Sequence, residues 1–138
     1  MKRVFKIIVI ALISVLTILL ITVNVRLLTA VDLNNRTAVK KNVLKQLHYL
    51  EQQLKEADLA HRMQQQYPEG FVFVHALYGL TWCAMARYED TNSVVFLKAV
   101  AEASNALHEI ESEQGRRNFD PNLLPAYGIF YRGWHNYL

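Results

Sequence analysis

The sequence predicts an all-α protein with one N-terminal transmembrane helix, a long amphipathic helix, an antiparallel helical hairpin and the start of a further helix at the C-terminus. Three observations predict this fold: a 19-residue run without charge, a long stretch without Gly or Pro, and polar breaks between later apolar stretches. We expect a basic flank at 1–6, a transmembrane helix at 7–25, a linker at 26–35 and a helical domain at 36–138, with helices at about 36–66, 71–88, 93–114 and 126–138.

The uncharged run from Ile7 to Val25 has the length of a membrane span. At ~1.5 Å per residue a helix of this run is roughly 28 Å long, close to the hydrocarbon thickness of a bilayer. A cleaved signal peptide is the alternative, but its apolar core is usually shorter and ends at a small-x-small site, whereas this run continues into Arg26 and Leu27. We favour an uncleaved signal-anchor that contacts the lipid bilayer.

The charges beside the run predict its orientation. Lys2, Arg3 and Lys6 precede it, whereas only Arg26 follows it before the opposing Asp32. Because basic residues are retained on the cytoplasmic side, we expect a single-pass protein with a cytoplasmic N-terminus and an exported body.

The segment from Arg36 to Gln66 is predicted to be one amphipathic helix because it contains no Gly or Pro. Apolar residues recur along it in steps of three and four, which places them on one face. These residues are Val43, Leu47, Leu50, Leu54 and Ala57. Pro68 ends the helix. The pattern spans two heptads, so we expect it to pack within its own chain instead of forming a coiled coil.

The next two helices form the predicted hairpin. The stretch from Phe71 to Tyr88 is apolar on nearly every side, so we expect a central helix that is covered all round. In the third helix the expected buried stripe is Phe96, Val100, Ala103, Leu107 and Ile110, and the expected water-facing residues are Lys98, Glu102, Glu109 and Ser112. The aromatic C-terminus carries no polar end and no helix stop, so we expect the natural chain to continue.

Charge and histidine patterns exclude several classes of function. Without the four basic residues that flank the apolar run, 11 basic and 12 acidic residues remain, so no positive surface is expected for nucleic acid. Cys83 is the only cysteine, which excludes an intrachain disulfide. The five histidines are too scattered for a metal motif, so we expect no metal, no cofactor and no catalytic residue. His75 stands out, because a polar ring in an apolar helix needs a partner, for which Tyr78 is a candidate.

Two segments repeat a common pattern at an interval of one helical hairpin. Leu77-Tyr78-Gly79-Leu80-Thr81-Trp82 and Ala126-Tyr127-Gly128-Ile129-Phe130-Tyr131 each place Tyr and Gly before an aliphatic residue and an aromatic residue. Such repeats are typical of stacked or ring-closed helix pairs. The glycine allows neighbouring helices to approach closely. The 49-residue interval is longer than the repeat of a tetratricopeptide adaptor, which makes that class less favoured.

The stretch His75-Ala76-Leu77-Tyr78-Gly79-Leu80, followed by Ala99-Val100-Ala101-Glu102-Ala103 and Leu107, resembles a hairpin of the α/α-toroid class. That class is the six-hairpin barrel of many glycan-processing enzymes and of some lyases and dehydratases. The resemblance covers roughly residues 67–138. It implies that sugar-contacting aromatics and acids gather in loops at helix ends, where this chain has Glu69, Asp120, Tyr127, Tyr131 and Trp134, and we take Tyr127, Tyr131 and Trp134 as candidate ligand-binding residues.

Two functions are consistent with these observations. The first is a membrane-anchored helical interaction or scaffold module without catalysis of its own, which displays an apolar helix pair to a protein partner or to the remainder of its own chain. The second is the N-terminal portion of an exported, membrane-anchored toroid enzyme, such as a glycan-processing one, whose catalytic acids lie outside this chain.

Overall fold

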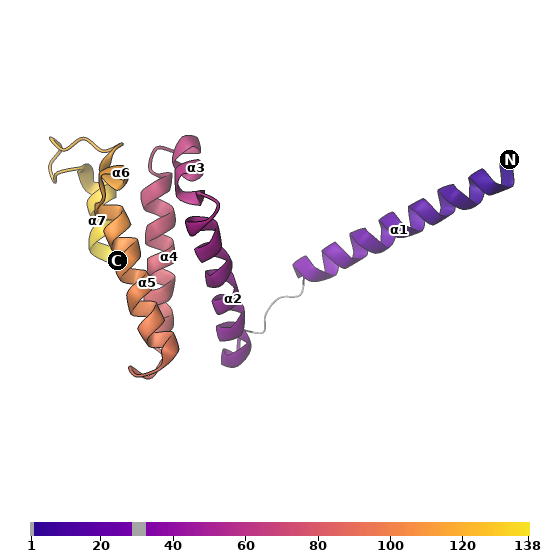
Figure 1. Ribbon diagram of the computed structural model, residues 1–138, viewed down its shortest axis with the longest axis horizontal. Helices are drawn as coiled ribbons and strands as arrows, with labels where there is room; N and C mark the ends of the chain where they lie inside the picture. The colour runs from indigo at the N-terminus through magenta and orange to yellow at the C-terminus, as the bar shows by residue number, and fades with distance from the viewer. Residues whose placement is uncertain (1, 29–32) are drawn as a thin grey trace. The chain divides into compact units, whose positions relative to one another are not determined.

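The computed structural model describes residues 2–28 and 33–138, and within those ranges it contains seven helices and no strand. The predicted all-α class is confirmed (Figure 1). The chain forms two compact units, Met1–Val39 and Lys40–Leu138.

Helix α1, Lys2–Leu28, contains one stretch, Phe5–Val25, that is long and apolar enough to cross a membrane. Three of its polar side chains donate within the helix: the Thr17 and Thr22 hydroxyls each donate to a carbonyl four residues earlier at 2.8 Å, and the Asn24 amide donates to Leu20 at 2.9 Å. In lipid no water would replace such bonds. Residues 26–28, expected in the linker, belong to the helix, whereas 29–32 of that linker lie outside the described residues.

The single helix predicted over 36–66 is wrong, because the structure divides it into α2, Arg36–Lys55, and α3, Leu59–Gln66. The break falls at Asp58, whose φ of 54° is left-handed. Asp tolerates that conformation better than most residues, and its carboxylate pairs with the ring of His61 one turn later. The predicted apolar stripe of α2 is confirmed, since Leu47 is buried and Val43, Leu50 and Leu54 pack around it.

Helices α4, Gly70–Ala86, and α5, Val94–Glu111, form the predicted hairpin at the centre of the second unit. The Ser93 hydroxyl accepts the Phe96 N–H at 3.1 Å and so caps α5. The first core cluster joins this hairpin to α2 and contains Leu47, Tyr78, Trp82, Ala99 and Ala106. Gly79 permits the close approach, since a Cβ at this position would lie 2.9 Å from the Cβ of Ala106.

Of the stripe predicted for α5 only Ile110 is buried, and the structure departs furthest from the prediction at Val100 and Glu102. Val100 is 49% exposed, whereas Glu102, expected to face water, is only 7% exposed. The buried residues of α5 are Ala99, Glu102, Ala106 and Ile110. The helix is turned so that its small alanines contact α4, and this orientation carries Glu102 into the space between α2 and α4.

Two short helices complete the unit. Ser112 ends α5, and its hydroxyl accepts the Gly115 N–H at 3.1 Å, which begins α6, Glu113–Arg116. Helix α7, Gly128–Tyr137, then places Tyr131 in a second core cluster with Val72, Ala76 and Ile110. The hydroxyl of Tyr131 donates to the Ile110 carbonyl at 3.0 Å, so this buried polar atom is satisfied.

The close contact at Gly79 generates a paired prediction. We expect Gly79→Ala to destabilise the full chain by about 1–3 kcal/mol, because Ala106 has no flexible atom that can move aside. Gly133→Ala is the control: its Cβ meets nothing within 4 Å in the middle of α7. That change is expected to stabilise by about 0.5–1 kcal/mol. Denaturant unfolding in detergent micelles, followed by tryptophan fluorescence, measures both, and an equal effect of the two changes would contradict the close packing.

Candidate functional site

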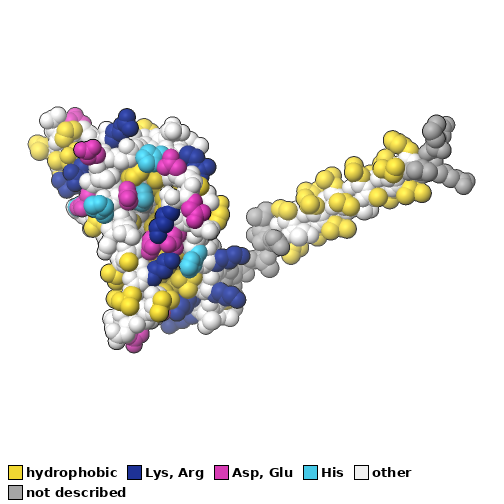
Figure 2. All heavy atoms as spheres, in the orientation of Figure 1, with side chains coloured by type: hydrophobic (Ala, Val, Ile, Leu, Met, Phe, Trp, Pro, Cys, Tyr) yellow, Lys and Arg dark blue, Asp and Glu magenta, His cyan; other side chains and the backbone are white. Residues whose placement is uncertain are grey.

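A cleft of about 340 Å³ opens between the end of α2, α3, α4 and α5. Helix α4 lines it with Phe71, His75 and Tyr78, which share one face at positions i, i+4 and i+7. Helix α5 lines it with Glu102, Asn105, Ala106, His108 and Glu109. Acidic, basic and histidine side chains gather in the middle of the face that Figure 2 shows.

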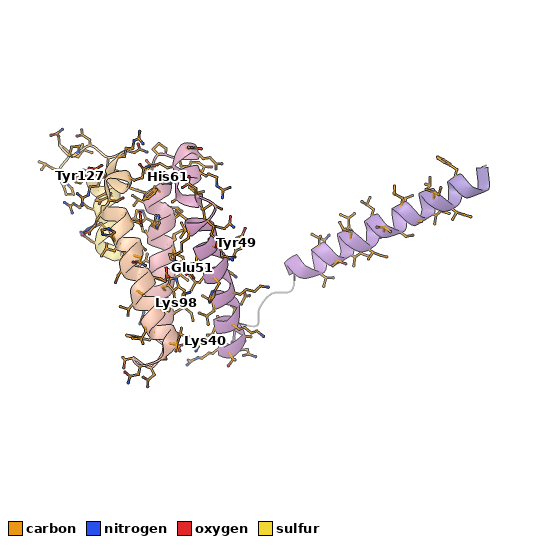
Figure 3. The ribbon with its side chains drawn as sticks, in the orientation of Figure 1. Lys40, Tyr49, Glu51, His61, Lys98 and Tyr127 are labelled. Carbon is orange, nitrogen blue, oxygen red and sulfur yellow. The ribbon has the colours of Figure 1, made fainter. Side chains whose placement is uncertain are left out.

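A network of charged and hydroxyl groups fills one end of the cleft. The buried carboxylate of Glu102 accepts the Tyr78 O–H at 2.9 Å and the Lys55 ammonium at 3.2 Å. Lys55 also donates to Glu51 at 2.8 Å, and Lys98 donates to the other oxygen of Glu51 at 2.7 Å. Figure 3 shows Glu51 and Lys98 directed toward one another from α2 and α5. The network therefore ties three helices together.

The network and its burial move the pKa values of Glu51 and Tyr78 further from neutral pH. Burial raises the pKa of Glu51, but hydrogen bonds from Lys55 and Lys98 outweigh it and lower that pKa to about 2. Burial also raises the pKa of Tyr78 well above its usual value, and the hydrogen bond to Glu102 acts in the same direction. Glu51 stays ionised and Tyr78 stays protonated across the physiological pH range.

His75 lies between this network and the other end of the cleft. Its side chain is 8% exposed, and neither ring nitrogen makes a hydrogen bond to a residue in the described ranges. Its ring packs on Phe71 with centroids 4.7 Å apart, and Phe71 in turn meets His61 edge-on at 5.3 Å. Burial lowers the pKa of His75 to about 4, and the neighbouring His61 acts in the same direction. His75 is therefore an uncharged donor and acceptor at neutral pH.

Sequence reasoning did not predict this cleft, although it drew attention to one residue of its lining. It singled out His75 and named Tyr78 as its candidate partner; the two line the same cleft, but Tyr78 donates to Glu102. It missed the charged network, because Glu51, Lys55 and Glu102 have the spacing of solvated helix surfaces. The available signal was the alanine pattern of α5, which places Ala99 and Ala106 on the side of Glu102.

The three aromatic residues predicted to bind a ligand lie in the second core cluster and its border. Tyr131 is buried, and its ring contacts that of half-buried Tyr127 with centroids 5.3 Å apart. Trp134 packs edge-on against Phe73 of α4 at 5.5 Å. The structure thus places Tyr131 and Trp134 on α7 and Tyr127 directly before it, and none of the three lines the cleft; their role in ligand binding stays a prediction. Of the acids considered with them, Glu69 precedes α4, and Asp120 lies in the loop before α7.

A second feature is an apolar ridge on the outer side of α4, made by Phe73, Leu77, Leu80 and Ala84. Their spacing of four, three and four residues places them on one helix face. Phe73 is 38% exposed and Leu77 is 44% exposed, Ala84 is exposed, and Leu80 is half-buried. The expectation that α4 is covered all round is wrong on this side, because α2, α3, α5 and α7 pack on its other sides.

Comparisons with protein-family models, with curated proteins and with solved structures find no match to this chain. The resemblance of residues 67–138 to α/α-toroid hairpins therefore stays a prediction.

The low pKa of Glu51 predicts a pH-dependent contribution to stability. Because the folded pKa lies below that of the unfolded chain, the contribution is present above about pH 4.5 and is lost as the pH falls toward 2. We expect Glu51→Gln to cost about 1–2 kcal/mol at pH 7, a value that allows for screening by water around half-exposed Lys55, and little near pH 2. Unfolding of the full chain at both pH values measures this. Glu56→Gln, an exposed change at the end of α2, is the control, and a pH-independent cost for Glu51→Gln would contradict the network.

Proposed function

We propose that this protein is a single-pass membrane protein whose second unit is a helical interaction module for a partner protein and has no catalytic activity of its own. The apolar ridge of α4 is the observation that carries the proposal. Isolated exposed apolar residues are common, but here Phe73, Leu77 and Ala84 are exposed on one helix face with half-buried Leu80 between them, a surface of the kind that binds other proteins.

Helix α1 supports the proposed membrane anchor. The side chains of Phe5–Val25 are exposed along its whole length, and none of them is charged except Lys6 near the start. The basic residues before the run favour a cytoplasmic N-terminus and an exported second unit.

The pKa shifts in the cleft favour binding over catalysis. A general acid or base works best with a pKa near the operating pH. Glu51 and His75 are shifted below neutrality, to about 2 and about 4, and Tyr78 is shifted upward from a value already above it. These three groups are held in one protonation state at neutral pH, which suits a structural or binding role.

The geometry of the ridge fits an amphipathic helix of the partner. Ridges of residues three and four apart on one helix pack into the grooves of another, and each buried Leu or Phe contributes about 1.5–3 kcal/mol. Phe73 and Leu77 have the largest exposed side chains on the ridge and are the expected centre of the contact.

Site-specific photocrosslinking in cells tests this surface. With the photoreactive residue in place of Leu77 we expect a discrete adduct larger than the monomer. With the residue in place of exposed Gln52 on α2 we expect none. Phe73→Glu should reduce the Leu77 adduct several-fold by placing a charge in the contact. An adduct of dimer mass alone would indicate a second copy instead of a partner, and no adduct at position 77 would contradict the proposal.

Cysteine labelling tests anchor and orientation. We expect the full chain to remain in the membrane pellet after an alkaline wash. In a Cys83→Ser background, Asn92→Cys in the exposed α4–α5 connection is expected to react with an impermeant maleimide in right-side-out vesicles, whereas Lys2→Cys reacts only after permeabilisation. The reverse pattern would place the second unit in the cytoplasm, and release by the wash would rule out the anchor.

A further inference from the structure

The two ends of the cleft differ in charge balance. Four carboxylates line it, those of Glu51, Asp58, Glu102 and Glu109, whereas Lys55 is the single Lys or Arg among the lining residues. Lys55 is already bound to Glu51 and Glu102 at one end. The Tyr78–Glu102 bond sets the register of the antiparallel hairpin, so Phe71 and Glu109 lie toward the other end, as His61 does in Figure 3. That end has no lysine or arginine: Asp58 pairs there with the ring of His61 at 2.5 Å, and the carboxylate of Glu109 has no partner within the described residues.

His75 provides an independent indication of a ligand. The residue is more than nine-tenths buried, but its ring nitrogens are not fully enclosed, since of the residues that the structure describes only Trp82 has, at Nε1, a fully buried side-chain N or O atom without a partner. The ring lines the cleft and has no hydrogen bond within the described residues. Its unused nitrogens are therefore available to a molecule in the cleft.

The walls between these polar groups are apolar. Phe71 presents its ring beside His75, and Leu54, Ala60 and Ala106 complete the apolar lining. A volume of about 340 Å³ lies at the lower end of the range for small-molecule sites. The cleft thus combines an aromatic surface, a neutral acceptor and excess negative charge.

We propose that this cleft binds a small organic cation, namely a primary amine carried on an aromatic or aliphatic body. The ammonium lies at the end lined by Asp58 and Glu109 and donates to a carboxylate and to His75. The body packs on Phe71, whose ring face also attracts a cation. A metal ion fits less well, because no group of three or more His, Cys, Asp or Glu side chains in the described part of the chain is arranged to hold one.

The protonation of His75 is consistent with this ligand. Burial lowers the pKa of its ring to about 4, so the ring is neutral at pH 7 and does not repel an ammonium. A neutral imidazole retains one nitrogen lone pair that accepts the N–H of the amine.

Calorimetry or thermal-shift titration of the full chain in detergent micelles tests the proposal with three probes. Tryptamine is the amine, indole-3-ethanol is its neutral counterpart and indole-3-propionate is the anion. We expect tryptamine to bind at least about tenfold more tightly than the alcohol, and the anion not to bind. Equal binding of the amine and the alcohol, preference for the anion, or no binding of tryptamine would overturn the proposal.

Variants locate the site. Exposed Glu109→Gln is expected to weaken tryptamine binding about tenfold and to leave the alcohol unaffected, because only the amine loses an ion pair. Glu56→Gln removes the same charge outside the cleft and is expected to leave tryptamine binding unchanged. His75→Gln keeps a hydrogen-bonding group at this position and tests the contact between the ammonium of the ligand and residue 75. Unchanged tryptamine affinity in both Glu109→Gln and His75→Gln would overturn the placement.

Discussion

The burial of one carboxylate constrains the arrangement of the second unit. Glu102 lies in the middle of α5 with little exposure, and an ionised carboxylate in such a place must be paired and hydrogen-bonded. Tyr78 and Lys55 meet this requirement from α4 and α2. Hydrogen bonds to a charged group are worth about 1.5–3 kcal/mol each, and losing one partner leaves the buried charge unsatisfied. The rotation of α5 and the position of α2 therefore depend on each other.

This constraint also explains the cleft. Helix α2 reaches the hairpin through the Glu51, Lys55 and Lys98 ion pairs and through Leu47, and it then stops at Lys55. The left-handed residue Asp58 redirects the chain into α3, which packs on α4. The cleft lies where α2 ends and α3 begins, and the change of direction brings Asp58 and His61 to it. Had the helix continued straight through residue 66, these two side chains would not line the same space as His75.

Periodicity predicted the elements that depend on local apolar spacing, and it failed where a tertiary contact decided the outcome. The α2 stripe and the α4–α5 hairpin follow from positions such as Leu47 and Gly79, and the structure confirms them. The break at Asp58 has no Gly or Pro to mark it, since the packing of α3 on α4 determines it. The burial of Glu102 contradicts the expectation that a charged residue of a helix faces water. Its two partners lie 24 and 47 residues away in the sequence, so no local pattern reveals them. The charged network of the cleft could therefore not be predicted from the sequence.

The two most apolar helices of the chain have different requirements for burial. The apolar stretch of α1 is long enough for a bilayer, and the Thr17 and Thr22 hydroxyls and the Asn24 amide donate to its own backbone. Helix α4 has 17 residues, which at ~1.5 Å each is shorter than the ~30 Å of a hydrocarbon core. It also carries His75 and Tyr78, which face a polar cleft. Lipid therefore suits α1, whereas the open ridge of α4 lies on a helix already fixed to α5 by polar contacts.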